Sequence, residues 1–173
     1  MLLAAPTAAH AAAGVETVYT SADEVTAGMW GSCAPVTYSV QGGVREDRWA
    51  VARAISQLET ATGQLYVEVP PAAASLSVII WPDVADSRYL QLDGTGPDGR
   101  PTDKGYTAPD GNSIDFLDGY VSQALVMHEL MLSRHLIEHD DPGGLLGHFV
   151  DPHTDRYSAP DTAMLQTTAC AGV

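Results

Sequence analysis

The sequence has few cations: eight Lys and Arg face 22 Asp and Glu, which gives a formal charge of −14 at pH 7. A field of that sign repels phosphate backbones and anionic membrane surfaces, and it argues against a nucleic-acid partner. The sequence also lacks any apolar run of about eighteen residues, so no membrane span is predicted. It contains no Gly-x-Ser-x-Gly elbow, P-loop or dinucleotide fingerprint, which argues against serine hydrolases and nucleotide-binding proteins.

Cysteine is scarce as well, with only Cys33 and Cys170 near the two ends of the predicted domain. Residues 1–13 (MLLAAPTAAHAAA) are uncharged and Ala-rich, and they resemble the second half of a secretory signal peptide whose basic start is missing. A frayed Ala-rich extension is the alternative. A secretory leader predicts a secreted protein in which Cys33 and Cys170 form a disulfide, whereas free buried thiols are the alternative.

A chain of 173 residues with 45% apolar residues is long enough to bury the core of one domain. No internal repeat occurs. After the leader, residues 14–31 are polar and rich in small side chains, and residues 32–173 are predicted to form the folded domain. The three tryptophans, Trp30, Trp49 and Trp81, are predicted to be anchors in the core or at its edge.

The clearest helix is predicted over 44–62, where Val51, Ile55 and Leu58 recur at helical spacing and Gly63 follows as a stop. The segment 75–81 (SLSVIIW) is apolar enough to form a central strand. Further strands are predicted over 35–40, 65–69 and 113–117, a long loop over 82–111, a second helix from 119 or 120 to 139, and a short third helix from about 160. These elements predict one α+β domain with helices packed on a mixed sheet.

The second predicted helix concentrates ionisable side chains, among them His128, Glu129, His135 and His139. A His-Glu pair after an apolar run is typical of zinc hydrolases, in which the His binds the metal and the Glu activates a water molecule. On a straight helix the three histidines share one face, but His128 and His139 are about 16 Å apart along the axis. A common metal site therefore requires a break in the helix between Met131 and Arg134.

Several segments, in their order along the chain, are similar to the secreted bacterial matrixin-like branch of the metzincin (zincin) zinc metallopeptidases. The similarity covers about residues 33–166, and VMHEL and HDDPGG are its most specific parts. The matching segments are PVTYSV, a helix ending in TATG, SVIIW, GNSIDFL, VMHEL and HDDPGGLL. The resemblance implies a zincin-like fold with a twisted mixed sheet, a long backing helix and an active-site helix beneath a cleft.

The family pattern is His-Glu-x-x-His-x-x-Gly-x-x-His followed by a methionine turn. His128 matches the first zinc ligand, and Glu129 matches the general base. The remaining positions depart from the pattern, with Leu132 at the second ligand, His135 at the glycine, Glu138 at the third ligand and Leu146 near the methionine. His135 and His139 are candidate replacements for the missing zinc ligands, chosen by proximity and not by a match.

Other ligand sets remain open. Residues 135–139 spell the inverted motif His-x-x-Glu-His of another zinc peptidase group, although no Glu follows Glu138 to complete it. An Asp is then a conceivable third ligand, at Asp140, Asp151 or Asp155. His148 and His153 lie in a later loop, where a histidine is usually solvated.

The resemblance implies a secreted, monomeric, zinc-dependent metalloendopeptidase that hydrolyses a peptide or protein substrate. The alternative is a non-catalytic descendant that keeps the fold and serves as a secreted binding or interaction domain. The altered ligand positions Leu132 and Glu138 favour the alternative, whereas the intact pair of His128 and Glu129 favours the enzyme.

Overall fold

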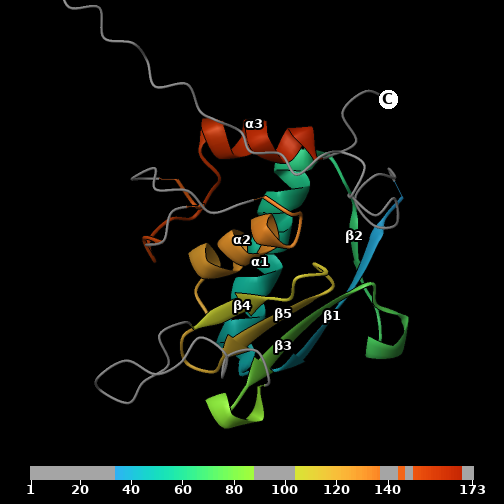
Figure 1. Ribbon diagram of the computed structural model, residues 1–173, viewed down its shortest axis with the longest axis vertical. Coiled ribbons are helices and arrows are strands. Elements are labelled where there is room, and N and C mark those ends of the chain that lie inside the picture. Colours follow the sequence, from blue (N-terminus) through green and yellow to red (C-terminus); the bar gives the residue numbers. More distant parts are fainter. Residues whose placement is uncertain (1–33, 88–103, 137–143, 147–149, 169–173) are drawn as a thin grey trace, which may run out of the picture.

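The computed structural model describes residues 34–87, 104–136, 144–146 and 150–168 (Figure 1). The described residues form five strands and three α-helices. The strands are β1 (Val36–Gly42), β2 (Tyr66–Glu68), β3 (Leu76–Trp81), β4 (Gly105–Thr107) and β5 (Ser113–Leu117), and the helices are α1 (Arg45–Thr62), α2 (Gln123–Leu132) and α3 (Ala159–Thr167). Short 3-10 turns occupy Pro71–Ala73 and Val84–Asp86. None of the described helices combines the length and the apolar character that a membrane span requires.

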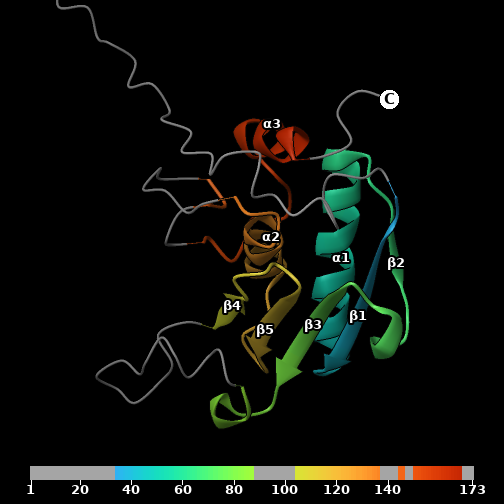
Figure 2. The ribbon, with the colours of Figure 1, turned by 45° about the vertical axis from the view of Figure 1, so that its right-hand side comes forward.

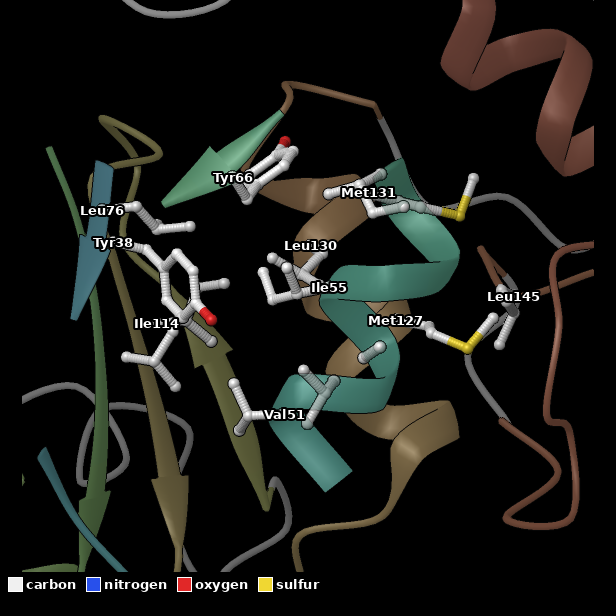
Figure 3. Close-up of a cluster of buried hydrophobic side chains, with 14 of the residues drawn as sticks. Tyr38, Val51, Ile55, Tyr66, Leu76, Ile114, Met127, Leu130, Met131 and Leu145 are labelled. Atoms are coloured by element: carbon white, nitrogen blue, oxygen red, sulfur yellow. The ribbon is translucent and has the colours of Figure 1, made fainter. Parts of the chain in front are cut away.

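The strands form one sheet in the order β2-β1-β3-β5-β4. Four strands are parallel, and the edge strand β4 pairs antiparallel with β5. Helices α1 and α2 lie side by side on the same side of this sheet (Figures 2 and 3). The predicted mixed sheet with helices packed on it is confirmed, as is the central position of β3.

The core fills the space between the sheet and the two helices (Figure 3). Along β3, Leu76, Val78 and Ile80 are buried and alternate with half-buried residues, so one face of the strand meets the helices. Val51 and Ile55 project from α1 toward the sheet (Figure 3). Burial of each such aliphatic side chain contributes about 1.5–3 kcal/mol to folding.

Helix α1 follows β1 through a turn that requires glycine. Gly42 and Gly43 have φ angles of 72° and 68°, and a Cβ atom at Gly42 would lie 2.1 Å from the Ile80 carbonyl oxygen. The helix begins where the Asp47 carboxylate accepts a hydrogen bond from the Val44 N–H at 3.0 Å. It ends at Gly63 (φ 69°), whose N–H donates to the Glu59 carbonyl. The predicted helix and its glycine stop are confirmed.

Three predictions from the sequence are wrong. Helix α2 does not run from 119 or 120 to 139: it begins after Ser122, whose hydroxyl accepts from the Leu125 N–H at 3.1 Å, and it ends at Leu132. The predicted loop 82–111 contains the strand β4, which its pairing with β5 stabilises. Trp49 is not in the core, because it lies on the outward face of α1 with 64% of its surface exposed. Trp81 is half-buried, and Trp30 lies outside the described residues.

Candidate functional site

His128 and Glu129 occupy the buried middle of α2, where they are only 5% and 3% exposed. A polar side chain in such a place is stable only if its hydrogen-bonding groups have partners. The two residues find those partners in different elements, one in the segment that precedes α3 and the other in β4.

The orientation of the His128 imidazole is set by the backbone of Leu145. Nδ1 forms a hydrogen bond with the Leu145 carbonyl oxygen. Because a carbonyl only accepts, Nδ1 carries a proton, and in a neutral imidazole Nε2 is then the nitrogen that can bind a metal. Nε2 lies 4.0 Å from the carboxylate oxygen Oε1 of Glu129. A hydrogen bond from one ring nitrogen to a carbonyl is the arrangement that usually orients a metal-binding histidine.

Leu145 is in turn connected to α3. Its N–H donates to Oδ1 of the buried Asp161 at 3.3 Å. Oδ2 of Asp161 accepts from the Ser158 hydroxyl at 2.7 Å and from the Ser158 N–H at 3.0 Å, which closes the N-terminal cap of α3. The start of α3 therefore fixes the backbone segment that holds the His128 ring.

The Glu129 carboxylate is positioned by β4. The Thr107 hydroxyl donates to Oε2 at 2.7 Å and also lies 3.0 Å from the Glu129 carbonyl oxygen. Gly105 leaves room for the other oxygen, since a Cβ atom there would lie 2.8 Å from Oε1. Sequence reasoning missed Thr107 and Gly105, because they lie within the predicted loop and far from the motif.

The position of the second zinc ligand in the metzincin pattern is apolar in the structure. Leu132 lies one helical turn after His128 and packs, half-buried, against the hydrophobic core. His135, at the glycine position of the pattern, follows in a turn and has a φ angle of 61°. Left-handed backbone of this kind is uncommon for residues other than glycine. His135 is half-buried, and the third candidate, His139, lies outside the described residues.

Within the described ranges, no three His, Cys, Asp or Glu side chains gather closely enough to hold a metal ion. His153 is exposed, and its N–H donates to the Asp151 carboxylate at 2.9 Å. Asp155 is exposed and pairs with Arg156. The remaining candidates, Asp140, His148, Cys33 and Cys170, lie outside the described residues, so the disulfide stays a prediction.

Tyr157 contacts α2 at Met127, the residue that precedes His128 and Glu129. Its buried hydroxyl lies 3.2 Å from the Met127 carbonyl oxygen, to which it donates. Burial, with smaller contributions from the neighbouring Tyr66 and Asp161, raises the pKa of the Tyr157 hydroxyl well above its usual value, although the nearby Arg134 opposes the shift. Tyr157 is therefore a neutral donor at physiological pH, which suits a structural role.

The sequence matches none of the protein-family models and none of the curated proteins with which it was compared.

Proposed function

We propose that this chain is a secreted, monomeric zinc metalloendopeptidase of matrixin-like type, with a zincin-like fold and with Glu129 as its general base. One observation carries the proposal: Nε2 of the buried His128, whose Nδ1 is bonded to the Leu145 carbonyl, lies 4.0 Å from the carboxylate of Glu129. A metal ligand beside a general base is an arrangement used in metal-dependent hydrolysis of a peptide bond.

The end of α2 also supports the proposal. A site shared by His128, His135 and His139 requires the helix to break between Met131 and Arg134, and α2 ends at Leu132 within that stretch. The mixed sheet, the 18-residue helix α1 and the separate helix that carries the pair agree with the fold that the resemblance implies.

The residues present fit a zinc ion in part. The hydrogen bond at Nδ1 leaves Nε2 of His128 for a metal, Leu132 supplies no ligand atom, and His135 and His139 are the candidates for the remaining positions. When bound, zinc would supply positive charge that lowers the pKa of a water molecule and polarises a peptide carbonyl.

The chain's own contribution to catalysis is proton transfer by Glu129. Its carboxylate removes a proton from the attacking water and returns it to the nitrogen of the leaving amine. The hydrogen bond from Thr107 holds Oε2, so that Oε1 remains directed toward His128. A buried carboxylate held in this way needs little reorganisation during the reaction.

The test measures the zinc content of the purified chain together with its hydrolysis of an unfolded protein such as reduced casein. Glu129→Ala is expected to keep zinc and to lose activity by about 10²- to 10⁴-fold, the usual contribution of a general base. His128→Ala is expected to lose both zinc and activity. His153→Ala removes an exposed histidine and serves as the matched control, with both properties unchanged. Absence of zinc at micromolar supply, or stoichiometric zinc without hydrolysis, would contradict the proposal.

A non-catalytic secreted binding domain is the second candidate, and the packing of Leu132 at the second ligand position favours it. It predicts a folded chain that binds no zinc and does not hydrolyse an unfolded protein. Stoichiometric zinc would rule it out.

A further inference from the structure

The outward face of α1 carries a tryptophan where helices normally carry small or charged side chains. Successive steps of about 100° place Trp49 on the opposite side of the helix from the fully buried Leu58. Figure 3 shows Val51 and Ile55 directed into the core, so Trp49 points into solvent, where 64% of its surface is exposed. An exposed tryptophan of this kind is a typical anchor for a binding partner.

Two arginines flank the ring. Arg45 and Arg53 lie one helical turn before and after Trp49, both exposed, and each is about 40° around the axis from it. Arg53 stacks on the indole, with Cζ 4.9 Å from the ring centroid. We call Arg45, Trp49 and Arg53 the α1 strip. Neither arginine forms an ion pair within the described residues, and Glu46 beside them on α1 is exposed.

The position of Arg53 over the indole restricts its guanidinium and keeps it beside Trp49. The planar fork of N–H donors of a guanidinium matches a carboxylate. A ligand that meets the strip therefore finds an apolar surface between two cationic groups. The Cα atoms of Arg45 and Arg53 are about 12 Å apart along the helix axis, and the Arg53 side chain bends back over Trp49, so two anionic groups at about that spacing or somewhat closer are within reach of both guanidinium groups.

We propose that the α1 strip is a docking site for a short acidic peptide segment in extended conformation, with the pattern acidic-x-apolar-x-acidic. In an extended peptide, residues i, i+2 and i+4 face the same side, and i and i+4 are about 13 Å apart. The two carboxylates then reach Arg45 and Arg53 while the apolar side chain covers Trp49. A long polyanion fits less well, because the chain as a whole has a charge of −14 and repels whatever extends beyond the strip.

The test uses the full chain and the peptide Ser-Glu-Ser-Leu-Ser-Glu-Ser, labelled with an uncharged dye, in a fluorescence anisotropy titration at about 50 mM salt. Screening is weak at that salt concentration. Trp49→Ala and Arg53→Glu are each expected to weaken binding by about tenfold or more, the loss typical of an anchor residue. Arg156→Glu, which makes the same charge change at a cation that is 79% exposed elsewhere, is expected to change it by less than about twofold. Trp49 and Arg53 are exposed, so the variants should unfold at the temperature of the parent chain.

Four outcomes would overturn the proposal. The first would be no binding of the peptide at 1 mM, which corresponds to about 4 kcal/mol of affinity. The second would be equal binding of a peptide of the same composition in which the Glu residues are adjacent. The third would be tighter, Arg53-dependent binding of a sulfated polysaccharide, which would assign the strip to polyanions. The fourth would be a dimer in sedimentation that Trp49→Ala dissociates, which would assign the strip to a second copy of the chain.

Discussion

Replacement of Arg134 by Met should destabilise the domain more than any surface change. The guanidinium is 2% exposed and joins three parts of the fold. Nη1 donates to Gln64 Oε1 at 3.0 Å and to the Tyr66 hydroxyl at 2.6 Å, while Nε and Nη2 donate to Thr168 Oγ1 and O, both at 2.9 Å. The turn after α2, the start of β2 and the end of α3 therefore share one cation.

The magnitude follows from the acceptors that the substitution leaves behind. Methionine fills much of the volume of the arginine stem, but Gln64 and Tyr66 lose the hydrogen bonds from Arg134. A buried hydrogen bond to a charged group contributes about 1.5–3 kcal/mol. Relief of the desolvated charge offsets part of this loss, so we expect about 3–5 kcal/mol, as for other buried networks broken on one side. For a domain of this size that is a decrease in Tm of about 10–15 °C.

Urea and thermal unfolding followed by circular dichroism measure the change. Arg156→Met is the matched control, because Arg156 is 79% exposed and its ion pair with Asp155 (3.2 Å) contributes at most about 1 kcal/mol. A loss below about 1 kcal/mol for Arg134→Met would refute the reasoning, since it would mean that the charge costs as much to bury as its hydrogen bonds return.

Three further predictions concern the sheet edge and the helices. Burial, with the carboxyl of Asp118 nearby, raises the pKa of Asp47 above its ordinary 3.8. The stability that this group contributes at lower pH is therefore lost as the pH rises through the raised pKa. Asp47→Asn keeps an acceptor oxygen and should flatten this loss in urea midpoints measured from pH 3.5 to 7. Gly105→Ala places a methyl group 2.8 Å from Glu129 Oε1 and should lower the free energy of unfolding in urea by about 1–3 kcal/mol. In the control Gly144→Ala the methyl group lies 3.5 Å from Asp161 Oδ1, and the loss should be less than about 1 kcal/mol. Equal losses would contradict this prediction. Leu132→His places an imidazole one helical turn after His128 and should tighten zinc binding at least about tenfold by calorimetry; unchanged affinity would mean that position 132 does not face the ion.

The sequence predicts well those elements whose buried side is marked by regularly spaced apolar residues. The spacing of Val51, Ile55 and Leu58 defines α1, and the apolar run of β3 indicates its central position. The same spacing places Trp49 outward, so its exposure was present in the pattern, and the prediction of a core tryptophan followed residue type instead. The three residues of β4 carry no periodic signal, because pairing with β5 determines that strand.

The candidate site divides in the same way. His128 and Glu129 are adjacent in a recognisable motif, so the sequence predicted them. Thr107, which holds the Glu129 carboxylate, and Leu145, whose carbonyl orients the His128 ring, are brought there by tertiary packing. Contacts of that kind leave no pattern of spacing in a single sequence.

The end of α2 relates the stability of the fold to the proposed metal site. Neither Gly nor Pro interrupts the segment, yet the helix stops where Arg134 enters its buried network and Ser133 Oγ donates back to the Leu130 carbonyl at 2.8 Å. Gly111 also approaches closely, since a Cβ atom there would lie 2.4 Å from the Ser133 carbonyl oxygen. If the helix continued, the residue at position 139 would lie about 16 Å along the axis from His128, too far for one cation. The interactions that end α2 are therefore a structural requirement of the proposed zinc site, and they are also those that connect α2 to β2 and α3.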